Sequence, residues 1–248
     1  MIQDLHSHTY YSFCGADRPE DLVEGAIAGG IELLGISDHS HGIGNARLDV
    51  MFYDGDLGQD YYRTLTRYFD HMTLIKEKYA DKIKILRGIE VCTHTYEKRT
   101  ALPESADISF FDYCLIEHMD ALEFSSTKGD LFSYADRCGC ANVGIAHTDM
   151  FKFIERIGEK PYDYFKRMAE RGIFWEMNVS YDSVHNFRVH PYMLKFFEDE
   201  EQQDIIKRSG VRLSVGFDGH RCNEYKPDRV ADYCRRIEKM GIKMAFEK

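Results

Sequence analysis

The sequence lacks the apolar segments that would hold the chain in a membrane or send it through one. No apolar run approaches the roughly 18 residues that a membrane-spanning helix needs, and the mean hydropathy is -0.45. The opening residues, MIQDLHSH, contain neither the basic stretch nor the apolar stretch of a secretory signal peptide. We therefore expect a cytoplasmic protein with no membrane partner.

Paired cysteines and glycine-rich phosphate loops are also absent. The seven cysteines are an odd number and never occur as Cys-x-x-Cys, which favours reduced thiols in a reducing compartment. The sequence has no Gly-x-Gly-x-x-Gly motif and no other glycine loop of the kind that cradles phosphate. A dinucleotide-binding fold is therefore not predicted.

An excess of basic residues is missing as well. The chain has 42 Asp and Glu against 32 Lys and Arg, which gives a formal net charge of -10. Such a charge repels nucleic acid and other polyanions at long range. We do not expect nucleic acid as a partner, and a small anionic substrate would need metal ions or a few arginines at its site.

The sequence does contain a repeated alternation of helices and strands. Helical segments end in glycine, and each is followed by a short apolar strand that ends in His, Asp or Glu. Clear cases are Gly29-Gly30 before IELLGISDH and Gly210 before VRLSVGFDGH. Glycine ends a helix readily in the left-handed conformation, and such apolar runs are typical of buried parallel strands.

This alternation predicts an α/β fold. Strands are expected near residues 2–8, 32–38, 82–91, 113–118, 142–147, 173–179 and 212–217. Helices are expected near 19–28, 59–79, 162–171, 191–208 and 227–240. Since 44% of the 248 residues are hydrophobic and no change in composition marks a boundary, we expect one domain over residues 1–248. Many βα units without a dinucleotide motif favour a barrel over an open sheet.

The segment Asp4-Leu5-His6-Ser7-His8 lies in the first of these strands. Side chains two residues apart on a strand point to the same side, so Asp4, His6 and His8 are expected on one face. Two neutral imidazoles at this spacing can bind one zinc, iron, nickel or copper ion.

The other predicted strands also end in candidate ligands or polar partners. These residues are Asp38, His39, Glu90, Glu117, His118, His147, Asp149, Glu176, Asn178, Asp218 and His220. The carboxyl ends of barrel strands meet at one mouth, and clustered His, Asp and Glu are what a metal site requires. A purely structural role, as a helix cap or a buried hydrogen-bonded group, stays open for Asp38, Glu117 and Asn178.

The chain resembles the polymerase and histidinol phosphatase (PHP) superfamily in motifs that span nearly its whole length, in family order. The matching motifs are His6-Ser7-His8-Thr9, Ser37-Asp38-His39, Gly88-Ile89-Glu90, Glu117-His118, Ala146-His147-Thr148-Asp149 and Asp218-Gly219-His220. The resemblance implies a distorted (β/α)7 TIM-like barrel of PHP type. It also implies two or three divalent metal ions, which we expect to be zinc, manganese or iron.

The same resemblance implies a ligand set for each ion. The first ion would be held by His6, His8, Glu90 and Asp218, and the second by the shared Glu90 with His118 and His147. The third would be held by His39, His220 and Cys14, a position where the family usually has His or Asp. Thiolate binds zinc strongly but disfavours magnesium or manganese, so a packed free thiol is the alternative role for Cys14.

The remaining histidines are expected to be structural. His71 lies inside a predicted helix, and His94, His185 and His190 lie in predicted loops, where a surface or capping role is the simplest. For His41, two residues after His39, both roles stay open.

Metal ions that share a hydroxide can hydrolyse a phosphate ester by in-line attack without a protein nucleophile. The catalytic residues would be Glu90, as the bridging ligand, and Asp218 or a metal-bound histidine such as His220, either of which could manage the proton. Arginine binds phosphate well, and the candidates for substrate binding are Arg188, Arg221 and Arg156. A surface role is the alternative for all three.

The sequence therefore predicts a metal-dependent phosphomonoesterase that acts on a small phosphorylated substrate. Its length and the motif Glu176-x-Asn178-x-Ser180 look most like the histidinol-phosphatase branch, which converts L-histidinol phosphate to L-histidinol and phosphate. One alternative is a PHP-type phosphodiesterase or exonuclease on nucleotides or nucleic acid, although the acidic balance counts against it. Another is a non-catalytic metal-binding regulatory module, although all but one ligand position is retained.

Overall fold

The computed structural model describes residues 1–43, 58–95, 101–104, 106–182 and 190–247. Its centre is one sheet of seven parallel strands in chain order. The strands are β1 (Gln3–Asp4), β2 (Leu33–Ile36), β3 (Lys84–Cys92), β4 (Tyr113–Glu117), β5 (Val143–Ile145), β6 (Phe174–Asn178) and β7 (Leu213–Gly216).

The first and last strands lie side by side, which nearly closes the sheet into a barrel. The backbone N–H of Leu5 donates to the carbonyl oxygen of Val215 at 2.9 Å, and that of Asp218 donates to His6 at 2.7 Å. Beyond these bonds, Ser7 forms a parallel bridge with Gly219. The prediction of a seven-stranded α/β barrel is therefore confirmed.

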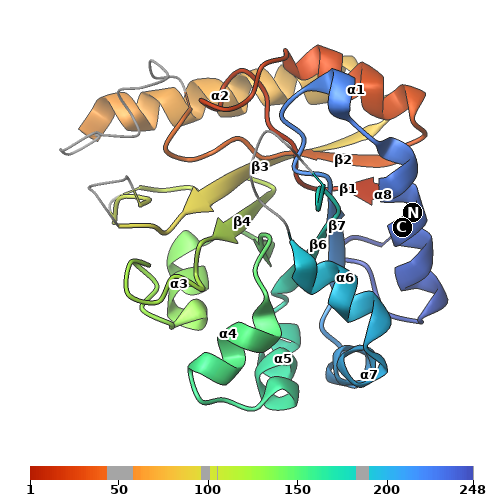
Figure 1. Ribbon diagram of the computed structural model, residues 1–248. Coiled ribbons are helices and arrows are strands. Elements are labelled where there is room, and N and C mark those ends of the chain that lie inside the picture. Colours follow the sequence, from red (N-terminus) through yellow and green to blue (C-terminus); the bar gives the residue numbers. More distant parts are fainter. Residues whose placement is uncertain (44–57, 96–100, 105, 183–189, 248) are drawn as a thin grey trace.

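Helices cover the outside of the barrel (Figure 1). They are α1 (Pro19–Ala28), α2 (Gly58–Lys78), α3 (Leu131–Cys138), α4 (Met150–Arg156), α5 (Pro161–Glu170), α6 (Pro191–Glu198), α7 (Glu200–Ser209) and α8 (Pro227–Lys239), with a short 3-10 helix, η3 (Cys222–Glu224). Helices α1 and α2 pack beside β2 and β3, while α8 packs against β1 and β7. None of the helices in the described ranges is both long and apolar enough to cross a membrane.

The single helix predicted over residues 191–208 is wrong, because the chain forms two helices there. Helix α6 ends at Glu198, and Asp199 takes an extended conformation with φ -104° and ψ 98°. The Asp199 carboxylate then accepts the backbone N–H of Gln202 at 3.0 Å and caps α7. An aspartate that can satisfy the first free N–H groups of a new helix competes well with continuing the old one.

The core has two parts, one between the sheet and the helices and a smaller one inside the barrel. The inner part includes Leu5, Leu33, Tyr113, Leu115 and Phe174, all fully buried. The Tyr113 hydroxyl donates to the carbonyl oxygen of Leu5 at 2.6 Å. These side chains fill the barrel beneath the carboxyl ends of the strands. The polar residues at those ends therefore lie directly above a packed apolar core.

Candidate metal centre

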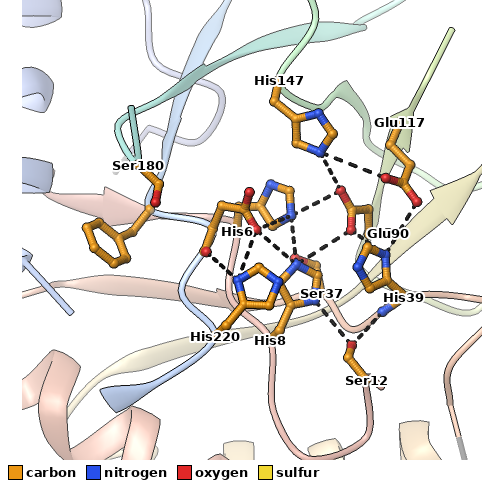
Figure 2. Close-up of polar contacts among 12 residues, drawn as sticks. His6, His8, Ser12, Ser37, His39, Glu90, Glu117, His147, Ser180 and His220 are labelled. Atoms are coloured by element: carbon orange, nitrogen blue, oxygen red, sulfur yellow. Dashed lines mark hydrogen bonds and ion pairs between the residues drawn. The ribbon is translucent and has the colours of Figure 1, made fainter. Parts of the chain in front are cut away.

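The strand ends bring their polar side chains together at the barrel mouth, as the barrel geometry predicts (Figure 2). His6 and His8 follow β1, His39 follows β2, Glu90 lies in β3, Glu117 ends β4, His147 follows β5, and Asp218 and His220 follow β7. The side chains of His6, Glu90 and Glu117 have no exposed surface. The mouth is therefore a buried cluster of imidazoles and carboxylates.

The four ligands expected for the first ion lie together. The Nε2 atoms of His6 and His8 are 3.1 Å apart. Glu90 Oε1 lies 3.1 Å from His6 Nε2, and Asp218 Oδ1 lies 3.2 Å from His8 Nε2. His6 Nε2 also lies 3.6 Å from Asp218 Oδ1, and His8 Nε2 lies 3.5 Å from Glu90 Oε2, so the group offers two nitrogens and two carboxylates to one cation.

Asp4, which the alternating pattern put on the same face as His6 and His8, does not join them. The regular strand ends at Asp4, and its Oδ1 accepts the backbone N–H groups of His6 at 3.2 Å and Phe217 at 3.0 Å. The carboxylate thus takes the place of a backbone carbonyl between β1 and β7. Strict alternation breaks down at this point, and Asp4 has a structural role.

The residues expected around the second ion lie at the carboxyl ends of three neighbouring strands, β3, β4 and β5. His147 Nε2 lies 2.9 Å from Glu90 Oε1. His118 Nε2 lies 2.9 Å from Glu117 Oε2, and the same carboxylate oxygen is 3.9 Å from His147 Nε2. Glu117, for which a structural role stayed open, therefore lies among the expected ligands.

The residues expected around the third ion also converge, and His8 joins them. One ligand atom from each of His8, Cys14, His39 and His220 lies within 4.8 Å of the others. Burial opposes ionisation of the Cys14 thiol, but the imidazoles of His39 and His220 outweigh it and lower its pKa. A thiolate beside three imidazoles is a donor set that zinc accepts.

A second layer of polar groups fixes the rings. Glu176 Oε1 lies 2.7 Å from His6 Nδ1, the ring nitrogen that faces away from Glu90 and Asp218. Ser12 Oγ lies 3.2 Å from His8 Nδ1 and donates to Asp38 Oδ1 at 2.6 Å. Asp38 is therefore a buried hydrogen-bonded support, the structural alternative left open for it.

The carboxylates at the centre stay ionised although they are buried. Burial opposes ionisation of Glu90, but the imidazoles of His39 and His6 hold the pKa of its carboxyl well below the usual range. His6 and His220 do the same for the pKa of Asp218. Burial lowers the pKa of His8 to about 3, with help from His220 and His39, so its ring is neutral and able to bind a cation.

Three candidate ligands have unusual backbones. Among the described residues, four that are not glycine have a positive φ, and three of these are His118 at 61°, His147 at 24° and Asp218 at 56°. L-residues adopt this region at a cost of about 1 to 3 kcal/mol. Leu115 and Ala146 face the inside of the barrel, so strand alternation would turn His118 and His147 away from the mouth. Both residues turn back to the mouth with a positive φ.

The expected surface or capping role is wrong for His190. Its side chain is 7% exposed and stacks on His147 with ring centroids 5.2 Å apart, and it makes no side-chain cap to α6. His94 similarly packs edge-on against His118 at 5.4 Å. His41 lies 4.8 Å from His39 by ring centroids, and its ligand atoms fall within reach of Glu117. His185 lies outside the described residues.

Of the three predicted arginines, two lie in the described chain. Arg156 ends α4 and donates to the carbonyl oxygen of Asp120 at 2.7 Å. Arg221 is exposed at the start of η3, directly after His220. Arg188 lies outside the described residues. Their substrate-binding role stays a prediction.

A cavity of about 310 Å³ opens beside the cluster. Its walls are Ser180, Asp182, Phe217, Asp218, His220, Asn223, Glu224 and Lys226. Asp218 and His220 thus belong both to the cluster and to the cavity. The Lys226 amino group lies 3.0 Å from Asp182 Oδ2 and brings a cation to the same wall.

The donor set fits divalent transition metal ions. Buried imidazoles that are held by second-layer carboxylates or hydroxyls suit zinc, iron and manganese, and the ionised carboxylates would leave a buried negative charge without cations nearby. Overlapping groups of three or four donors share His6, His8, His39 and Glu117. This overlap fits a centre with more than one ion.

Comparisons with known proteins agree with the fold. The family model described as the PHP domain matches residues 4–244. A histidinol phosphate phosphatase from Lactococcus lactis subsp. lactis Il1403, solved with zinc, L-histidinol and phosphate, is 18% identical and has a TM-score of 0.56, with 98% of this chain and 95% of that chain covered. A Listeria monocytogenes structure described as a histidinol phosphatase is 16% identical with a TM-score of 0.53, covering 88% and 95%. No curated protein sequence matched the chain. Because the family model covers almost all of it, this chain belongs to the PHP domain family.

Proposed function

We propose that this chain hydrolyses a small phosphomonoester with the help of two or three divalent metal ions. The observation that carries the proposal is the convergence of His6, His8 and Glu90 with Asp218, a residue that also lines the adjacent cavity. A bound substrate would therefore lie against the metal ligands. Membership of the PHP domain family and the fold of the histidinol phosphatase structures support the same reaction class.

We propose the following ligands for the ions. His6, His8, Glu90 and Asp218 would hold the first, Glu90 with His118 and His147 the second, and Cys14, His39 and His220 the third. When bound, such ions lower the pKa of water and neutralise charge on phosphoryl oxygens. The protein supplies the fixed positions through the second-layer contacts of Glu176 and Ser12.

The proton for the departing alcohol would come from a residue that belongs to both the cluster and the cavity wall. His220 Nδ1 lies 2.8 Å from the carbonyl oxygen of Asp218 and 3.6 Å from its Oδ1. Both side chains line the cavity, so a leaving group seated there would lie beside them. His220 is placed to donate a proton to the ester oxygen, while the Asp218 carboxylate, which stays ionised, could only accept one.

The cavity favours a small organic group over a polymer. A volume of about 310 Å³ is at the low end of small-molecule pockets. The net charge of -10 repels a nucleic acid backbone, which disfavours the exonuclease alternative. L-histidinol phosphate is the first substrate to test, because the Lactococcus lactis protein was solved with L-histidinol and phosphate. Ser180, from the Glu176-x-Asn178-x-Ser180 motif, lines this cavity.

A substrate panel tests the proposal. Purified protein, reconstituted with zinc, manganese or iron and checked by elemental analysis, is assayed with L-histidinol phosphate, other small phosphomonoesters, a phosphodiester and single-stranded DNA. We expect phosphate release from at least one monoester, with L-histidinol phosphate giving the highest kcat/KM.

The Asp218→Asn variant should lose more than about 100-fold in kcat, because it removes a ligand charge and a cavity wall group together. Asp163→Asn, an exposed carboxylate in α5, is the matched control and should keep full activity. Cleavage of the diester or the DNA alone would reject the phosphomonoesterase in favour of the nuclease alternative. A metal-loaded protein that turns over none of these substrates would instead favour the regulatory module.

A further inference from the structure

We infer that Glu117 is an additional metal ligand, which supplies a second carboxylate at the position of His118 and His147. This goes beyond the ligand set that the PHP motifs imply, in which Glu90 alone gives the second ion a carboxylate. The inference rests on the cluster being a metal centre and is independent of which ester, if any, the chain hydrolyses.

The first argument is the position of the carboxylate. Glu117 ends β4 with no exposed side-chain surface, and its backbone pairs with Cys92 in β3. Its carbonyl oxygen accepts the Thr93 hydroxyl at 2.7 Å, which fixes the backbone on the side of the neighbouring strand. Leu115 and Tyr113, two and four residues earlier, point into the barrel. The Glu117 side chain therefore points to the barrel mouth by ordinary alternation.

The second argument is which ring nitrogens Glu117 faces. Its Oε2 lies 3.9 Å from His147 Nε2, and its Oε1 lies 3.3 Å from His39 Nδ1. Glu90 faces the same two atoms, with Oε1 at 2.9 Å from His147 Nε2 and Oε2 at 2.7 Å from His39 Nδ1. Figure 2 shows the two carboxylates next to each other, between the rings of His147 and His39. Glu117 thus approaches the same ring nitrogens of His147 and His39 as Glu90 does.

A supporting carboxylate behaves differently, and Glu176 provides the comparison within this chain. Glu176 contacts His6 through Nδ1 at 2.7 Å, while His6 Nε2 faces Glu90 on the other side of the ring. A group that only orients a ligand histidine binds the nitrogen that does not face the ion. Glu117 contacts His118 through Nε2 at 2.9 Å, and it faces His147 through the nitrogen that Glu90 also faces.

The third argument concerns the donors gathered around Glu117. One ligand atom from each of His39, His41 and Glu117 lies within 4.8 Å of the others, and the same holds for Cys92, Glu117 and His118. A fully buried carboxylate among imidazoles is expensive unless it is paired with a cation. Adding Glu117 gives the second ion two carboxylates and two imidazoles, and a second anionic ligand offsets its charge within the protein.

The direct test is a crystal structure of the protein loaded with zinc alone, with the ions located by anomalous diffraction at the zinc edge. We expect an ion with a Glu117 carboxylate oxygen at roughly 2.0 to 2.2 Å, the ordinary zinc–oxygen distance. An ion bound by His118 and His147 with both Glu117 oxygens beyond about 3 Å would overturn the inference. A parent protein that binds no zinc would overturn the metal centre itself, which is a separate result.

Counting zinc in solution provides a second test of whether Glu117 is a ligand. Glu117→Gln keeps the shape but removes the charge, so zinc counted by elemental analysis after a mild chelator wash should fall by about one ion per chain. Glu123→Gln, an exposed glutamate in the loop after β4, is the matched control and should keep the parent count. Equal zinc counts in Glu117→Gln and the parent would reject Glu117 as a ligand, provided that circular dichroism shows both proteins folded.

Discussion

Glu176 Oε1 lies 2.7 Å from Nδ1 of His6, and this contact decides which nitrogen of His6 faces the metal centre. A histidine that donates Nδ1–H to a carboxylate presents the lone pair of Nε2 to a cation. The other oxygen of Glu176 accepts the backbone N–H of His147 at 2.7 Å. One buried carboxylate on β6 therefore positions residues on both sides of the barrel mouth.

Removing this support should weaken metal binding without removing a ligand. For Glu176→Gln we expect zinc to bind about 10- to 100-fold more weakly at one position, because an amide holds the His6 ring less firmly in its binding orientation. Competition with a chelator measures the affinity, and Glu170→Gln, exposed at the end of α5, is the control. An unchanged affinity in Glu176→Gln would show that His6 is oriented by other contacts.

Gly216, in β7, leaves the space in which His6 and Glu176 meet. A Cβ atom at this position would overlap both Glu176 Oε1 and the Cβ of His6. Gly216→Ala should therefore cost roughly 1 to 3 kcal/mol of unfolding free energy and also weaken zinc binding. Gly25→Ala in α1, where a Cβ would meet only Tyr225 at an ordinary 3.7 Å, is the control and should be neutral or stabilising. Urea unfolding curves for the two variants decide the matter, and equal midpoints would contradict the account.

Cys14 should behave as a ligand thiolate. Cys14→Ala is expected to lower the zinc count by about one, while Cys14→Asp should keep it and shift the preference from zinc towards manganese. Cys222→Ala, at a partly buried thiol in η3 whose pKa is raised to about 12 by burial and by Asp17, is the control. If Cys14→Ala retains the parent stoichiometry, Cys14 only packs.

Asp112 gives the fold a pH dependence that is separate from the metal centre. Burial opposes ionisation, but Arg87, which contacts both carboxylate oxygens, and Lys76 lower the pKa of Asp112 to about 2, from an ordinary 3.8. Because the folded value is the lower one, the stabilisation is complete above the ordinary pKa and is lost as the pH falls from about 5 to 2. After allowance for solvent screening it amounts to roughly 1 to 2 kcal/mol.

The measurement is the unfolding free energy at several pH values for the parent and for Asp112→Asn. The variant should be less stable than the parent at pH 7, and the difference should shrink as the pH is lowered towards 2. A difference that stays constant over this range would mean that the ion pair with Arg87 contributes little.

Strand periodicity and the PHP motifs predicted the barrel and most of the cluster, because buried strands and strand-end ligands leave strong local patterns. Alternation through Tyr113 and Leu115 also points Glu117 to the mouth. The PHP motifs assign no ligand at this position, however, and only the short distances from Glu117 to His39 and His118 suggest that it is one. Alternation alone would turn His118 away, and its φ of 61° turns it back. Tertiary contacts impose this positive φ, so no local sequence pattern predicts it.

The position of His190 was similarly beyond local reasoning. Its contact with His147 joins residues that lie in different βα units, and a histidine before a helix carries no sequence signal for such a contact. The break at Asp199 did have a signal, since an aspartate can cap a new helix, but the apolar periodicity runs through it from α6 into α7.

The measurement that tests the central claim most directly is the metal content of the purified protein after reconstitution with zinc, manganese or iron, compared with the double variant His6→Ala and His8→Ala. We predict about two or more ions per parent chain, and about one fewer in the variant, whose barrel should remain folded by circular dichroism. Less than about one ion per parent chain after reconstitution with every metal would contradict the account.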